Sequence, residues 1–148
     1  MESFENYPKL SLINFIILCG YIMLQNESAV LVADNTGAKK AKIFRILKWS
    51  NAKSATIGDR VVVAIKEAAA GWSVKKWEVA QAVIVRTVKE IKRNDGSYIR
   101  FGDNAVVLLS KNDKWEVAPI GKRVFGPVAR ELRNLWYRTI TNMAEEVV

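Results

Sequence analysis

Short apolar runs rich in β-branched residues, each bounded by turn residues, constrain the fold of this chain more than any other feature. Three such runs cover 60–65, 79–88 and 105–109, with little of the periodicity of an amphipathic helix. A shorter run at 29–33 ends in a turn sequence, and 40–47 alternates charged and apolar residues. Several short strands separated by turns are typical of a small closed barrel. We therefore predict a mainly β protein.

A helix is expected only near the C-terminus. Pro127 stands directly before Val128-Ala-Arg-Glu-Leu-Arg133. A proline near a first helical turn, followed by good helix formers, is a start signal. The sequence shows neither an internal repeat nor a low-complexity tract, and its 148 residues are enough for one domain with a small appendage.

The first 22 residues differ from the rest. No charged residue occurs in 10–26, and this stretch is close to the length of a membrane span but contains several polar residues. Acidic residues near its start are unlike a secretory signal or an organellar transit peptide. We divide the chain into an apolar extension, 1–22, which docks on a partner, and a β domain, 23–148. A short membrane anchor over 10–24 is the alternative.

Basic residues are concentrated in the β domain. The chain carries a net charge of +8, yet residues 1–30 hold one Lys and three Glu. A basic body of this kind favours a polyanionic partner, because cations that neutralise phosphates release condensed counterions. A soluble basic protein with no nucleic-acid role would have the same composition, so the charge alone does not decide between the two.

Histidine is absent and Cys19 is the one cysteine. The usual general base and the commonest metal ligand are therefore missing, and no disulfide can form within the chain. A chain with one cysteine is typical of a reducing or matrix-like compartment. Gly121-Lys122 lacks the glycine spacing of a phosphate loop, and Glu145-Glu146 is interpreted as a solvated tail. We predict no catalytic residue, metal site, cofactor or small-molecule substrate.

The strongest local signal is a basic hairpin between Arg86 and Arg100. Asn94-Asp95-Gly96 is a compact reversal with cations on both sides. A strand pair here would form a projecting arm whose arginines bind phosphates through two hydrogen bonds each and whose Tyr98 stacks on bases. An ordinary solvated hairpin would have the same charges. The RNA-binding candidates of this hairpin are Arg86, Lys89, Lys92, Arg93, Tyr98 and Arg100.

Smaller basic clusters repeat the pattern. One follows the turn after 29–33, one lies between Trp72 and Trp77, and one precedes and enters the expected C-terminal helix. Each is weak alone because basic surface loops are common, but together they favour RNA. The further candidates are Lys39, Lys40, Lys48, Lys75, Lys76, Lys122, Arg123, Arg130 and Arg133.

The stretch Val32-Ala-Asp-Asn-Thr-Gly-Ala-Lys-Lys40 resembles the opening motif of the universal large-subunit ribosomal proteins of the L-fourteen family. Further segments similar to that family follow in its order and spacing, from residue 23 to residue 148. These segments are 57–59, 74–76, 82–87, 95–101, 104–108, 121–133 and 144–147.

The resemblance implies a five-stranded barrel with a projecting β-hairpin and short C-terminal helices. It also implies binding to large-subunit rRNA near the subunit interface, contact with small-subunit rRNA in intersubunit bridges, and contact with a neighbouring large-subunit protein. In some members the C-terminal part is the docking surface for a ribosome-silencing factor. Basic residues on matched motif positions are Lys39, Lys40, Arg86, Lys92, Arg93, Arg100, Lys122, Arg123, Arg130 and Arg133.

The sequence departs from the family pattern at several loops. Lys48-Trp49-Ser50 interrupts a loop that is usually glycine-rich, Trp77 stands where glycine is usual, and Asn94 replaces a proline. Together with the apolar extension, these departures favour a mitochondrial ribosome in the matrix over a bacterial or plastid one. The runner-up interpretation is a membrane-associated basic β-barrel that binds acidic partners.

Overall fold

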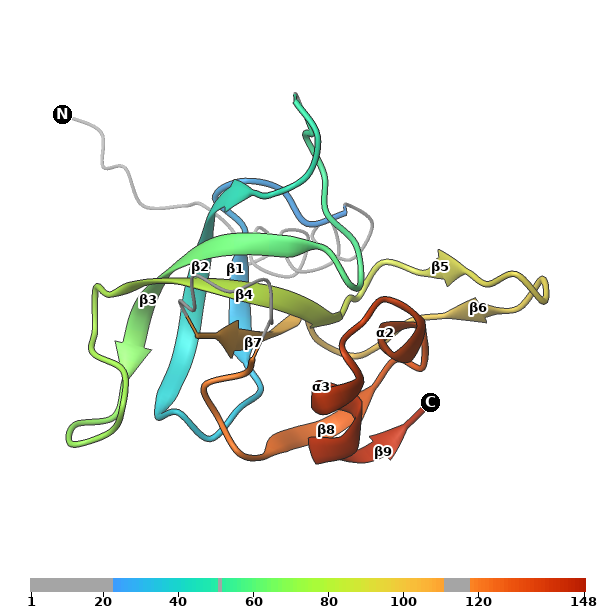
Figure 1. The fold of residues 1–148 in the computed structure, drawn as a ribbon. Coiled ribbons are helices and arrows are strands. Elements are labelled where there is room, and N and C mark those ends of the chain that lie inside the picture. The colour runs from blue at the N-terminus through green and yellow to red at the C-terminus, as the bar shows by residue number, and fades with distance from the viewer. Residues whose placement is uncertain (1–22, 51, 111–117) are drawn as a thin grey trace, which may run out of the picture.

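The computed structural model describes residues 23–50, 52–110 and 118–148. Five strands close into a barrel in which each neighbouring pair is antiparallel except the closing pair, β1 and β7, which is parallel (Figure 1). The predicted mainly β, five-stranded barrel is confirmed. In order around the barrel the strands are β1 (Ala29–Val32), β2 (Ala38–Ile46), β3 (Arg60–Ala68), β4 (Val79–Arg86) and β7 (Ala105–Leu109).

Alternation of side chains along β4 and β7 builds two cores from the same strands. Ala82 and Ile84 of β4 pack inside the barrel, whereas Val83 and Val85 point outward into a second apolar cluster. Successive side chains of a strand point to opposite faces of the sheet, so burial of both sets means that the outer face is covered. The C-terminal segment supplies that cover through side chains such as Leu132.

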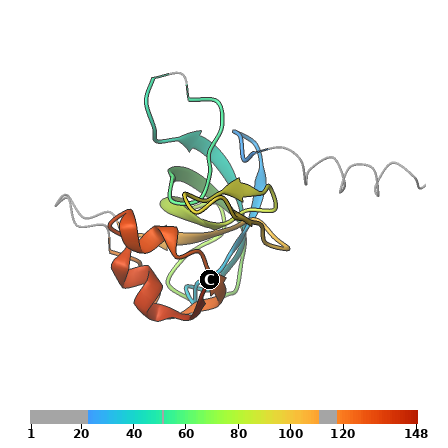
Figure 2. The same cartoon turned by 90° about the vertical axis from the view of Figure 1, so that its right-hand side faces the viewer.

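The C-terminal segment is a small unit of its own. Its strands β8 (Val124–Val128) and β9 (Ala144–Val147) pair in parallel, and the helices α2 (Glu131–Asn134) and α3 (Arg138–Met143) connect them. In Figure 2 the two helices lie beside the barrel.

Two details of the C-terminal prediction are wrong. Pro127 and Val128 belong to a strand, and the first helix begins only at Glu131. Val128 is buried in the outer core, and a proline is tolerated in a two-stranded sheet because such strands are edges. Glu145 and Glu146, interpreted from sequence as a solvated tail, are exposed as expected, but they belong to the strand β9 and Glu145 pairs with Arg123.

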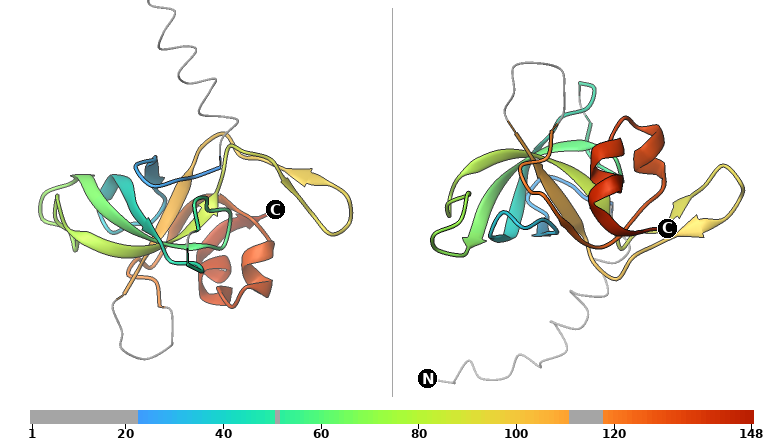
Figure 3. Two further views of the ribbon diagram at one scale, coloured as in Figure 1. Left: turned by 90° about the horizontal axis from the view of Figure 1, so that it is seen from above. Right: turned by 60° about the horizontal axis from the view of Figure 1, so that its bottom comes forward.

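A hairpin of β5 (Ile91–Lys92) and β6 (Tyr98–Ile99) projects from the barrel beside the C-terminal helices (Figures 1 and 3). Its reversal is closed by the Arg93 N–H, which donates to the Ser97 carbonyl at 2.8 Å, and by Gly96, whose φ is 84°. A positive φ is the conformation that glycine adopts without steric cost, so the Asp-Gly pair fits this turn.

The apolar extension, 1–22, lies outside the described residues, so neither its docking nor the anchor proposed for 10–24 is tested by the structure. Within the described ranges no helix is long and apolar enough to cross a membrane.

Candidate nucleic-acid interface

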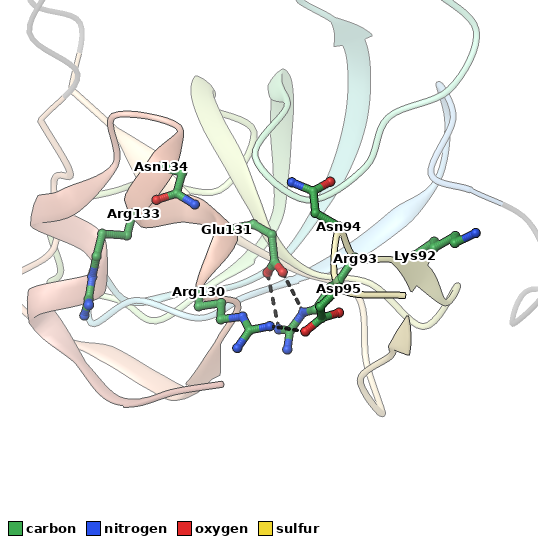
Figure 4. A pocket seen from close by; sticks show the side chains of 8 residues that line it. All are labelled: Lys92, Arg93, Asn94, Asp95, Arg130, Glu131, Arg133 and Asn134. Atoms are coloured by element: carbon green, nitrogen blue, oxygen red, sulfur yellow. Dashed lines mark hydrogen bonds and ion pairs between the residues drawn. The ribbon is translucent and has the colours of Figure 1, made fainter. Parts of the chain in front are cut away.

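The projecting hairpin is fastened to the C-terminal segment by two arginines. The Arg93 Nε lies 2.6 Å from the Glu131 carboxylate, and its Nη2 donates to the Val148 carbonyl at 2.7 Å. From the other side, Arg130 donates to the Asp95 carboxylate at 2.9 Å (Figure 4). These contacts join residues far apart in the sequence and set the direction in which the hairpin points.

The fastened hairpin and α2 enclose a cleft of about 410 Å³. Lys92 and Arg133 lie at its edge, both exposed, and no ion pair within the described part of the chain joins either one (Figure 4). Their charges are therefore available to a ligand, whereas Arg93 is paired with Glu131 and Arg130 is paired with Asp95. The cleft can receive an anionic backbone but offers no nucleophile or metal-ligand set.

Asp95 at the hairpin tip remains ionised to low pH. Hydrogen bonds from the Ser97 hydroxyl and the Ser97 backbone N–H, followed by the Arg130 guanidinium, lower the pKa of Asp95 to about 2. Hydrogen bonds to a carboxylate favour its charged form. The contact between the hairpin tip and Arg130 is therefore intact at neutral pH.

Arg86, a sequence candidate for RNA binding, lies inside the protein with 8% of its surface exposed. It makes a two-pronged contact with Asp103, at 2.9 Å from Nε and 3.1 Å from Nη2. Its Nη1 donates to the carbonyls of Phe125 and Pro127 at 2.7 and 3.1 Å. Arg86 thus ties β4 to β8, and a guanidinium held in this way has little capacity left for a phosphate.

A second basic group gathers where the turn after β1 meets the loop before β8. The Asn35 side-chain oxygen accepts the backbone N–H groups of Lys122 and Arg123, at 2.8 and 3.3 Å. Lys39 and Lys122 are exposed and free of ion pairs within the described residues, whereas Arg123 pairs with Glu145. The turn and the loop that it contacts thus offer two free ammonium groups, on Lys39 and Lys122.

Buried Asp34 shapes this turn. Its carboxylate accepts the backbone N–H of Leu108 at 2.8 Å and that of Thr36 at 3.1 Å. Burial raises the pKa of Asp34, and these hydrogen bonds oppose the rise. Asp34 therefore has a structural role in the turn that leads into Lys39.

The remaining candidates are scattered. Lys75 and Lys76 lie on the connection between β3 and β4, at the opposite end of the barrel from the hairpin (Figures 1 and 3). Lys40 pairs with Glu67 at 3.0 Å, and Lys48 pairs with Asp59 at 2.8 Å.

The root of the hairpin is mixed in charge. Lys89 lies 3.8 Å from Glu90, whereas Tyr98 and Arg100 are exposed. Apart from the paired Arg86, Lys40 and Lys48, the predicted residues therefore lie at the hairpin, at the turn after β1 and at the connection from β3 to β4. The last two segments meet, because the Ala69 N–H donates to the Gly37 carbonyl at 2.8 Å.

One basic residue was missed by sequence reasoning. Lys66 of β3 lies with its Nζ 4.4 Å from the centre of the Trp77 ring. Only the antiparallel pairing of β3 with β4 brings these two residues together, so no local sequence signal marks Lys66. From sequence, Trp77 was noticed as a neighbour of the basic pair Lys75-Lys76 and as a departure from a usual glycine.

Comparison with known proteins agrees with this architecture. Residues 23–148 match the family described as ribosomal protein L14p/L23e. The chain is also 50% identical over 125 residues to the large ribosomal subunit protein uL14 of Petrotoga mobilis, a match that covers 84% of this chain and 99% of that protein.

Proposed function

We propose, since the chain belongs to the ribosomal protein L14p/L23e family, that it is a structural constituent of the large ribosomal subunit and binds the rRNA of that subunit near the subunit interface. The observation that supports RNA binding most directly is the pair of unengaged cations, Lys92 and Arg133, on a hairpin and helix that ion pairs hold in one orientation. A preset arrangement of cations loses little freedom on binding a phosphate backbone.

The proposed contacts divide by role. Lys92, Arg100 and Arg133 bind phosphates, and exposed Tyr98 offers a ring for stacking on an unpaired base. Arg93 and Arg130 are positioning residues, because their guanidinium groups hold the hairpin against α2. Arg86 is left out of this surface, since it is buried. Lys39 and Lys122 form a second phosphate contact.

Protein partners are proposed for the C-terminal segment. Leu135 and Trp136 lie between α2 and α3 and are exposed, Trp136 at 94%. An exposed apolar pair on a basic protein is suited to a protein neighbour. The family resemblance supports a neighbouring large-subunit protein and a ribosome-silencing factor as partners of this segment, and small-subunit rRNA as the partner across the interface in an intersubunit bridge.

We further propose a mitochondrial location for the particle. The support is the apolar extension and the loop departures at Trp49, Trp77 and Asn94. The relative named above is bacterial, so the proposal depends on these features alone. Recovery of the tagged protein in mitochondrial large subunits is the expected result, and recovery in particles of another compartment would contradict it.

The RNA surface is tested by charge reversal. Cells carrying Lys92→Glu with Arg133→Glu are expected to assemble fewer large subunits or to join subunits poorly, because two phosphate contacts become repulsive. The matched control is Lys53→Glu with Arg45→Glu, which makes the same change of charge at exposed residues outside the hairpin. Normal sedimentation profiles of monosomes in the Lys92 and Arg133 variant would show that the cleft does not contact RNA.

A further inference from the structure

Trp77 occupies a backbone position that is normally reserved for glycine. Its N–H donates to the Ile65 carbonyl at 2.8 Å, while the Ile65 N–H donates to the Glu78 carbonyl at 2.9 Å, so two residues of one strand oppose one residue of the other. This is a β-bulge of the type whose first residue is glycine in the left-handed region. Trp77 has a φ of 72°, a conformation that side chains with a Cβ adopt at a steric cost.

The ring recovers little of that cost by burial. Trp77 is 64% exposed, on the connection between β3 and β4 (Figure 3). Two cations lie over the ring, with the Nζ atoms of Lys66 and Lys76 at 4.4 and 5.3 Å from its centre. Such contacts are weak at exposed sites. A large ring at this position is therefore better explained by a partner outside the chain than by the fold.

The acids near these cations are engaged mainly with other groups. Glu67 is paired with Lys40, and Glu27 is paired with Lys42. The hydrogen bond and the charge of Lys42 and, less strongly, the charge of Lys66 lower the pKa of Glu27. Glu78 accepts the backbone N–H of Lys75 at 3.0 Å, and its carboxylate is the one acidic group beside the ring on this connection. The surface thus combines an open aromatic ring with the ammonium groups of Lys66, Lys75 and Lys76.

We propose that Trp77 is a stacking surface for an unpaired nucleotide of the large-subunit rRNA, with Lys66 and Lys76 on the phosphates that flank this nucleotide. A nucleotide consists of a flat aromatic base joined to an anionic phosphate. This surface offers an aromatic ring for the base and ammonium groups for the phosphate. The ammonium groups move from the ring to the phosphates as the base stacks. The proposal rests on the proposed ribosomal function and adds a further RNA contact, at the end of the barrel opposite the hairpin (Figure 1).

The test compares full-length variants for binding to rRNA extracted from the large subunits that contain this protein. Trp77→Gly and Trp77→Asn remove the ring but suit a positive φ, so both are expected to fold with a thermal midpoint at or above that of the wild type. Their affinity for the rRNA is expected to fall by about 5- to 150-fold, the range that stacking of one base provides. Trp77→Phe keeps a ring and is expected to recover most of the affinity.

Salt dependence separates the ring from the lysines. Trp77→Gly should lower affinity at every salt concentration without changing the slope of log K against log salt, because it removes no charge. Lys66→Gln with Lys76→Gln should make the slope shallower by about 0.7 for each lost phosphate contact. Trp136→Gly is the matched control, since Trp136 also has a positive φ, 70°, and is exposed, but no cation of the described residues lies over its ring.

Three results would overturn the proposal. If the wild type binds the rRNA and Trp77→Gly and Trp77→Asn bind it equally tightly, the stacking contact is refuted. The proposed function is not affected by that result. An equal loss in Trp136→Gly would show that the effect is not specific to this ring. Failure of the wild type itself to bind the rRNA would refute the proposed function and this inference together.

Discussion

At the scale of single residues, the same residue type has opposite roles in this protein. Arg86 and Lys92 are both basic positions near the hairpin, yet the first is buried against Asp103 and two carbonyls and the second is exposed. The sequence predicts both as RNA contacts because nothing local distinguishes them. Arg86 ends a run of buried residues in β4, but its partners come from segments that a single sequence does not pair with it.

Arg86→Met is expected to destabilise the protein by about 3 kcal/mol, because it leaves Asp103 without its partner and two carbonyls without donors. Urea unfolding measures this loss. Replacing both partners, as Arg86→Met with Asp103→Leu, should recover part of it. Arg100→Met is the control at an exposed position, with an expected change within about 0.5 kcal/mol. A small effect of Arg86→Met would contradict the structural role.

Asp95 provides a pH test of the hairpin tip. Its pKa in the folded protein, about 2, is below the ordinary value of 3.8, so its contribution to stability is fully present above pH 3.8 and is lost as the pH falls toward 2. The NMR shift of the Ser97 amide, which donates to Asp95, is expected to titrate with a midpoint near 2. Arg130→Ala should raise that midpoint. A midpoint near 4 in the wild type would show that these contacts are absent in solution.

At the scale of elements, strands were predictable and their surroundings were not. Alternation in β2 and the β-branched runs of β3, β4 and β7 identify the barrel strands, because side-chain period and β-propensity are local properties. The strand at Val124–Val128 was predicted as helix from Val128 onward, because its extended form depends on pairing with β9. That pairing joins segments separated by two helices.

Leu132 tests how the C-terminal segment is attached. It is fully buried in the outer core, on the α2 helix that carries Arg133. Leu132→Ala is expected to lower the free energy of unfolding by about 2–5 kcal/mol and to speed amide exchange in α2 and α3. Leu135→Ala, at an exposed position of the same segment, is the control. Equal exchange rates in the two variants would show that the segment does not depend on this core.

At the scale of the whole molecule, positive charge is spread over separate surfaces. The hairpin lies at one end of the barrel and the connection from β3 to β4 at the other (Figures 1 and 3). The turn that leads into Lys39 meets this connection, where the Ala69 N–H donates to the Gly37 carbonyl at 2.8 Å. The net charge and the family resemblance predict an RNA partner from sequence. They do not predict which cations are free, because ion pairs such as Arg93–Glu131 and Arg130–Asp95 form only in the folded chain.

Several separated RNA contacts should make the protein a stable part of a particle rather than a weakly associated one, because each contact adds to the others. Sedimentation of the tagged full-length protein through a sucrose gradient tests this central claim. Migration with the large subunit in high salt without detergent, and release from that fraction after ribonuclease treatment, is the result we predict. Recovery at the top of the gradient, or in a membrane pellet that only detergent dissolves, would contradict it.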